Sequence, residues 1–190
     1  AYLGAPESFS TKLKLSRIQL APLLRALKPG SEPQISGTLT SADIDLSGQP
    51  GPDLKRTLRG RAALAVKDAE LKGFNLAAKV LQAVRDLPVL AGPLYAAVPE
   101  NERNSLAANR TDITSLSASF SAADGSLRTQ DLTAETPLFR LRAQGSIGLD
   151  AALNLNAQIA FRPGFSAALA GKVKELKYMF NPQGEFELQL

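Results

Sequence analysis

Apolar and polar residues alternate one by one in several stretches of this chain, and this alternation constrains its fold more than any other feature. In 153–162 the apolar residues stand at every second position: Leu153, Leu155, Ala157, Ile159 and Phe161. A strand places such residues on one face, whereas a helix would distribute them around its axis. The same alternation recurs in 12–16, 43–47, 62–67, 116–122 and 139–144. The sequence therefore predicts a mainly β protein.

Turn signals separate the alternating stretches. Asp124-Gly125 lies between two of them and is a strong hairpin signal, and 149–152 joins the next pair. Residues 67–70 occupy an equivalent place, so 64–76 and 120–132 are both interpreted as strand, tight turn and strand. Chance similarity among Leu- and Ala-rich strands is the alternative to a true internal repeat. Strands with this spacing predict an antiparallel meander.

Four stretches depart from the alternation. Residues 20–27 and 76–90 show a helical spacing of apolar residues, and the second helix is expected to cap one end of the sheet. Residues 91–110 are expected to form a loop or a broken helix, and 165–176 a helix or a loop. The expected fold is a bent antiparallel meander sheet with two or three short helices.

The chain contains no His and no Cys, which excludes several classes of function. Ser-His-Asp and Cys-His catalysis, zinc sites built on imidazole or thiolate, iron–sulfur ligation and disulfides all need one of these residues. Glycine-rich phosphate loops are also absent from the sequence. An enzyme would have to use carboxylates, Lys, Ser, Thr or Tyr, and no acidic pair is placed for such chemistry. We therefore expect neither an enzyme nor a cofactor or metal site.

The run Asp43-x-Asp45-x-Ser47-Gly48 resembles the opening of an EF-hand calcium loop. Such a loop requires a bidentate Glu at its twelfth position, where this chain has Leu54. Because apolar residues alternate with the two Asp residues, we place their side chains on the polar face of a strand.

The chain has a formal net charge of +4 and one basic cluster, formed by Lys55, Arg56, Arg59 and Arg61. Nucleic-acid binding is disfavoured because the nearest aromatic residue is Phe74, and single strands need aromatic side chains for base stacking. The cluster is interpreted either as a solvated loop or as a contact for anionic lipid headgroups.

No stretch of the sequence has the pattern of a membrane-spanning helix. The longest uncharged run includes 88–99, which contains three prolines, and a spanning helix needs roughly 20 apolar residues. The chain begins at Ala1 without a visible signal peptide, and 185–190 has the pattern of the middle of a strand. We interpret residues 1–190 as a single fragment of a longer protein, with any targeting signal or membrane anchor outside it.

The apolar faces of the expected strands allow two interpretations. They can pack against one another in a closed core, or they can line a groove for acyl chains if the sheet curls. Small residues mixed with Leu suit both arrangements. The pattern alone favours the packed core.

Several segments resemble, in this order, the C-terminal region of the AsmA-like proteins of Gram-negative bacteria. They are 9–24, 35–39, 58–60 with 66–76, 111–116 with 123–127, and 141–150. Each is a short strand-and-turn pattern, and the order and spacing of the segments carry the resemblance, which covers roughly residues 9 to 160. The family has Gly at the first turn where this chain has Ala69, whereas the second turn keeps Gly125.

The resemblance implies an inner-membrane anchor and a long periplasmic body, a repeating β-groove that carries phospholipids between the inner and outer membranes. It favours the groove over the packed core and implies no catalytic residue. The implied partner is a phospholipid or another acyl-chain lipid, with Lys55, Arg56, Arg59 and Arg61 as headgroup contacts. The residues expected to line the groove are Leu116, Phe120, Leu127, Phe139, Leu141, Leu153, Leu155, Ile159 and Phe161.

Two other classes of function are considered. The chain could be a non-enzymatic scaffold that assists outer-membrane protein assembly and binds envelope proteins through open sheet edges. A hydrolase acting through carboxylates is the third hypothesis, and it lacks a placed acid pair.

Overall fold

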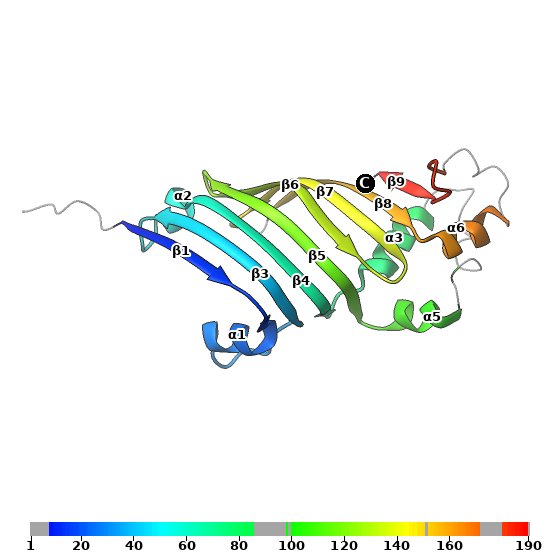
Figure 1. The fold of residues 1–190 in the computed structure, drawn as a ribbon, viewed down its shortest axis with the longest axis horizontal. Coiled ribbons are helices and arrows are strands. Elements are labelled where there is room, and N and C mark those ends of the chain that lie inside the picture. The colour runs from blue at the N-terminus through cyan, green and yellow to red at the C-terminus, as the bar shows by residue number, and fades with distance from the viewer. Residues whose placement is uncertain (1–7, 86–97, 99, 151, 172–179, 190) are drawn as a thin grey trace, which may run out of the picture.

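The computed structural model describes residues 8–85, 98, 100–150, 152–171 and 180–189. Within these residues the chain forms one antiparallel sheet of nine strands, which does not close into a barrel (Figure 1). The strand order is β1-β3-β4-β5-β6-β7-β8-β9, with β2 also paired to β3. The strands are β1 (Phe9–Leu15), β2 (Ile18–Gln19), β3 (Ile35–Gly48), β4 (Arg59–Lys72), β5 (Arg110–Ala123), β6 (Ser126–Glu135), β7 (Phe139–Gly148), β8 (Leu153–Phe161) and β9 (Glu187–Gln189). The predicted mainly β antiparallel meander is confirmed.

The hairpin between β5 and β6 turns at the predicted dipeptide. Asp124 and Gly125 have φ values of 51° and 74°, so both lie in the left-handed region that tight two-residue hairpin turns require. Asp and Gly tolerate this region better than most residues, which explains why the turn forms here.

The second predicted turn, at 67–70, does not exist. Strand β4 continues through it, because Lys67 pairs with Ser115 and Ala69 pairs with Ile113 of β5. The segment instead holds a β-bulge against β3, with Asp68 at a φ of 49°. A bulge and a tight turn both use residues that tolerate positive φ, such as Asp, so the sequence pattern does not distinguish them. The segment 64–76 is therefore not a second copy of the β5–β6 hairpin.

The helices are short and lie at the ends of the sheet. They are α1 (Leu20–Leu27), α2 (Leu54–Thr57), α3 (Leu76–Arg85), α5 (Glu100–Ala107) and α6 (Pro163–Ala170). The described residues thus contain more short helices than the two or three expected, and α2 was not anticipated.

The expected helical segments can be placed only in part. The prediction for 20–27 coincides with α1. Helix α3 accounts for the first part of 76–90, and 86–90 lie outside the described residues. Helix α5 lies within 91–110, of which 91–97 and 99 lie outside the described residues. Helix α6 begins two residues before 165–176, of which 172–176 are not described.

The larger hydrophobic core lies where α3 and α6 pack on β7, β8 and the C-terminal hairpin, in which Phe180 pairs with Phe186. Phe161 is fully buried, its ring stacks on Phe165 with centroids 4.6 Å apart, and Phe186 is 5.7 Å away. Val80 and Leu81 of α3 join the same cluster. A second, smaller cluster lies on β3, β4 and β5, next to Leu20 at the start of α1. The helices therefore cover only parts of the sheet.

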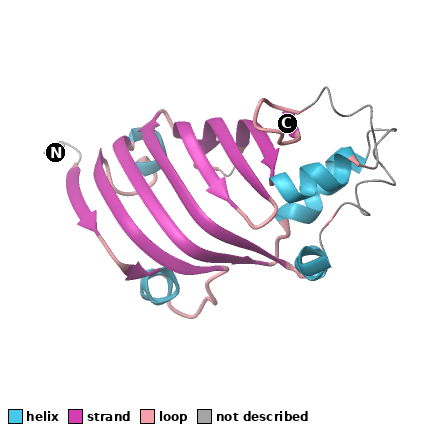
Figure 2. Cartoon of the chain, turned by 45° about the vertical axis from the view of Figure 1, so that its right-hand side comes forward, coloured by secondary structure: helices cyan, strands magenta, loops and turns pink. Residues whose placement is uncertain are grey.

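The sheet is strongly twisted and curved, as Figures 1 and 2 show, and its two ends differ. Helices α3, α5 and α6 gather at one end, which we call the helix end. At the other end, which we call the turn end, the β5–β6 and β7–β8 turns meet, because the Leu149 amide donates to the Gly125 carbonyl at 2.9 Å. The backbone of α2 lies next to the same turn: a Cβ on Gly125 would lie 3.7 Å from the Lys55 carbonyl oxygen.

Candidate functional site

The nine residues predicted to line a groove all lie on one face of the sheet, which we call the apolar face. Along one row of paired residues, Leu116 pairs with Ala134, Ala134 with Leu141, and Leu141 with Ile159. Along another, Leu127 pairs with Ile147 and Ile147 with Leu153. Because directly paired residues point to the same side of a sheet, the strand pattern alone assigned this face correctly.

At the helix end, the apolar face is covered. Phe139, Ile159 and Phe161 are fully buried in the larger core beneath α3 and α6. Leu141 is half-buried and packs against the same cluster, and Leu116 packs against the smaller one. The structure thus places these five candidates in or beside packed cores.

At the turn end, the apolar face is more open. Phe120, Leu127 and Leu155 are half-buried, and Leu153 has 69% of its surface exposed. Ala122 lies between the first two in the sheet, since it follows Phe120 in β5 by two residues and pairs with Leu127. We call these four large side chains, Phe120, Leu127, Leu153 and Leu155, the open patch.

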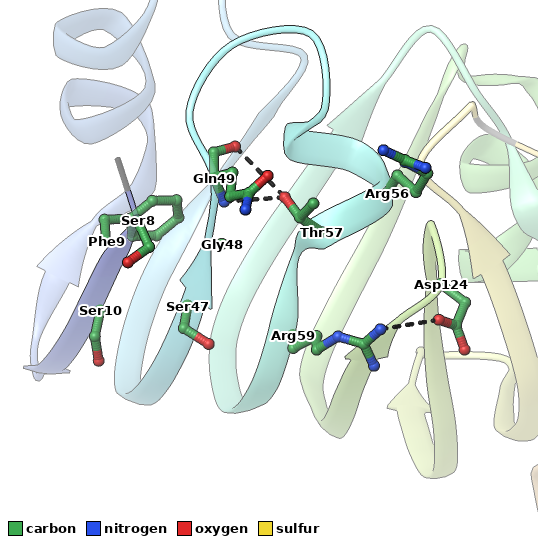
Figure 3. Close-up of a pocket in the computed structure, with 10 residues that line it drawn as sticks. All are labelled: Ser8, Phe9, Ser10, Ser47, Gly48, Gln49, Arg56, Thr57, Arg59 and Asp124. Atoms are coloured by element: carbon green, nitrogen blue, oxygen red, sulfur yellow. Dashed lines mark hydrogen bonds and ion pairs between the residues drawn. The ribbon is translucent and has the colours of Figure 1, made fainter. Parts of the chain in front are cut away.

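The predicted basic cluster separates into two parts. Arg56 and Arg59 both line a surface depression of about 690 Å³ where β1 begins, β3 ends and the α2 loop crosses (Figure 3). Lys55 is exposed on α2 but does not line the depression. Arg61 lies within β4 and pairs with Asp45 of β3 on the polar face. The structure therefore brings together two of the four predicted headgroup contacts.

The depression also contains residues that the sequence did not single out as functional. Ser10 and Ser47 form a pair across β1 and β3, and Asp124 comes from the β5–β6 turn. Asp124 accepts a hydrogen bond from Nη2 of Arg59 at 3.4 Å. These residues come from three separate segments, so only the folded sheet reveals their proximity.

The two aspartates that resemble the opening of an EF-hand calcium loop are paired with lysine side chains. Asp43 and Asp45 form ion pairs with Lys14 at 3.1 Å and Lys12 at 3.3 Å across β1 and β3. Among the described residues, no three acidic side chains gather closely enough to hold a metal ion. The described helices include none with the length and apolar character needed to cross a bilayer.

No protein-family model, no curated protein and no solved structure matches this chain. Its function must therefore be inferred from the geometry of the apolar face and of the basic depression.

Proposed function

We propose that this chain is a lipid-handling module of an AsmA-like periplasmic protein. The curved sheet forms an open groove, acyl chains lie against its apolar face, and headgroups remain in contact with water. The open patch is the observation that carries the proposal, because it leaves Leu153 exposed beside three half-buried large apolar side chains on an unclosed sheet. Contiguous apolar patches on a protein surface mark sites that bind ligands, proteins or membranes.

The apolar face suits acyl chains because it offers hydrophobic contact without fixed polar partners. Each methylene removed from water contributes about 0.8 kcal/mol, whatever its position along the chain. A bound chain can therefore slide along a continuous apolar strip with little change in free energy. Passive transport of phospholipid between the inner and outer membranes, which supports outer-membrane integrity, requires this property.

The proposed cellular location rests on the resemblance to the AsmA-like proteins. We propose that the parent protein is anchored in the inner membrane by a segment outside this chain and that residues 1–190 lie in the periplasm. The module then needs no catalytic residue and no cofactor, since the transported molecule is not changed chemically.

The test is native mass spectrometry of the purified chain, with solvent extraction and lipid analysis of the same sample. Leu155→Asp places a charge on the apolar face, whereas Asn156→Asp places the same charge on the opposite face of the same strand. We expect phospholipid to co-purify with the wild type and with Asn156→Asp, and to be lost from Leu155→Asp.

Circular dichroism of the two variants separates loss of lipid from loss of folding. Leu155 is only half-buried, so Leu155→Asp should keep the β-sheet spectrum. The proposal fails if both variants retain equal lipid, or if Leu155→Asp simply unfolds while Phe120→Ala, a milder change in the open patch, retains lipid fully.

A scaffold that assists outer-membrane protein assembly is the second candidate. The observation that favours it is the outer edge of β1, which pairs only with β3 among the described strands. Free backbone amides and carbonyls at such an edge can accept a strand from another protein. Capture of defined envelope proteins by lipid-free chain, lost when Thr11→Pro disrupts β1, would favour this function over lipid handling.

A further inference from the structure

The depression in Figure 3 lies at a corner of the sheet where both faces are within reach. Ser10 and Ser47 belong to the polar face, whereas Phe9 pairs with Gly48 on the apolar face. The Phe9 ring crosses Gly48 closely, since a Cβ there would lie 3.3 Å from its Cε1 atom. A ligand bound in the depression therefore lies beside apolar surface on one side and hydroxyl groups on the other.

Both signs of charge line the depression. Arg56 pairs with Asp53 at 3.1 Å, and Arg59 pairs with Asp124 at 3.4 Å. In each pair both side chains are more than half exposed, and ion pairs in that setting contribute little to stability. A ligand that offers each group a new partner can therefore separate them at small cost.

We propose that this depression binds a zwitterionic phosphate ester, a phosphodiester followed two carbons later by a primary ammonium group, as in an ethanolamine phospholipid headgroup. The inference rests on the proposed lipid-handling function and specifies the headgroup. Arg59 and Arg56 bind the phosphate oxygens, and Asp124, released from Arg59, accepts hydrogen bonds from the ammonium group. The guanidinium fork suits phosphate geometry, and the exchange leaves Arg59, Asp124 and both charges of the headgroup paired.

The presence of Asp124 favours this headgroup over a purely anionic one. A headgroup that ends in glycerol would separate Arg59 from Asp124 and leave the carboxylate beside a negative phosphate. The ammonium group removes that repulsion because it lies next to the phosphate in the same molecule. Arg59 supplies affinity and Asp124 supplies selectivity.

The test uses soluble headgroups without acyl chains, so it does not depend on the apolar face. The full chain is titrated with glycerophosphoethanolamine, glycerophosphoglycerol and inorganic phosphate, and binding is followed by amide chemical shifts in NMR spectra. We expect saturable binding of glycerophosphoethanolamine, with shifts at Ser47, Thr57 and Asp124, and weaker binding of the other two compounds.

Two variants and a matched control assign the roles. Arg59→Gln should weaken glycerophosphoethanolamine binding about tenfold, as expected for loss of a charge-assisted contact. Asp124→Asn should remove the preference over glycerophosphoglycerol. Arg25→Gln removes an exposed arginine from α1, which lies by the other end of β1. This control should change neither the affinity for glycerophosphoethanolamine nor the preference for it over glycerophosphoglycerol.

Several outcomes would overturn the proposal. They are equal binding of glycerophosphoethanolamine and inorganic phosphate, an unchanged preference in Asp124→Asn, or an equal effect of Arg25→Gln. If the headgroup compounds do not bind as expected but Leu155→Asp still loses its lipid, the headgroup site is rejected and the acyl-chain groove is retained. Headgroup binding without any co-purified lipid would instead reject the acyl-chain groove and leave this site in place.

Discussion

Asp131 supplies a hydrogen-bond acceptor where the β5–β6 ladder is interrupted. The register between these strands shifts between Ser117 and Ser121, and the Ser119 amide donates to Oδ1 of Asp131 at 2.7 Å instead of to a backbone carbonyl. The hydroxyl of Thr129 donates to the same oxygen at 3.2 Å. The bond from Ser119 is the main cause of a lowered pKa of Asp131, because it stabilises the charged carboxylate. The side chain thus completes a ladder that the bulge would leave open.

Asp131→Asn should therefore destabilise the protein in a pH-dependent way. A carboxylate with a lowered pKa in the folded state contributes stability above its unfolded pKa, and this contribution is lost as pH falls through the folded value. We expect a loss of about 1 kcal/mol between pH 5 and 8, since the site is exposed, and a smaller difference from wild type below about pH 4. Urea unfolding at several pH values measures both. A difference that does not change with pH would contradict the role of the charge.

At the scale of elements, one buried hydroxyl connects α6 to the end of β8 and to the C-terminal hairpin. The hydroxyl of Ser166 donates to the Phe161 carbonyl at 3.1 Å and accepts from the Phe186 amide at 2.9 Å. Ser166 has no exposed surface, so water cannot replace either bond. The hydroxyl therefore fixes the position of the C-terminal hairpin against β8 and α6.

Ser166→Ala should cost about 2 kcal/mol of unfolding free energy, because it leaves a buried amide and a buried carbonyl without this partner. Ser117→Ala, in the exposed polar face of β5, is the control and should change stability by less than about 0.5 kcal/mol. Thermal and urea unfolding of both variants give the comparison. Equal stability of the two would mean that the hairpin is held by its apolar contacts alone.

At the scale of the whole molecule, the apolar face has a covered half and an open half with opposite roles. Phe161→Ala should cost about 3–5 kcal/mol, since the ring is fully buried among other aromatic rings. Phe120→Ala should cost only about 1 kcal/mol, because this ring is half-buried, yet it should reduce the amount of co-purified lipid. Unfolding curves and lipid analysis of the same two variants test this division. Similar stability losses would show that Phe120 is also part of a packed core.

The alternation of residues predicts much of this fold because period two is a local property that pairing preserves. It placed all nine candidate residues on one face, including Leu116 and Ile159, which lie far apart in sequence. It did not predict the bulge at Asp68, because a bulge depends on the register of the neighbouring strand. It also did not predict which part of the face α3 and α6 would cover, since that depends on how the helices dock. The depression that joins Arg59 to Asp124 was unpredictable for the same reason.

The order of the strands has a consequence for how such a protein is made. From β3 to β8, each strand pairs with the strand that follows it in the sequence, so no pairing skips over an intervening strand. The chain can therefore add strands to the edge of the sheet one after another as synthesis proceeds. A duplication that inserted one more hairpin would lengthen the sheet without threading the chain through existing structure. Proteins with this topology can therefore change in length during evolution while the rules that pair their strands stay the same.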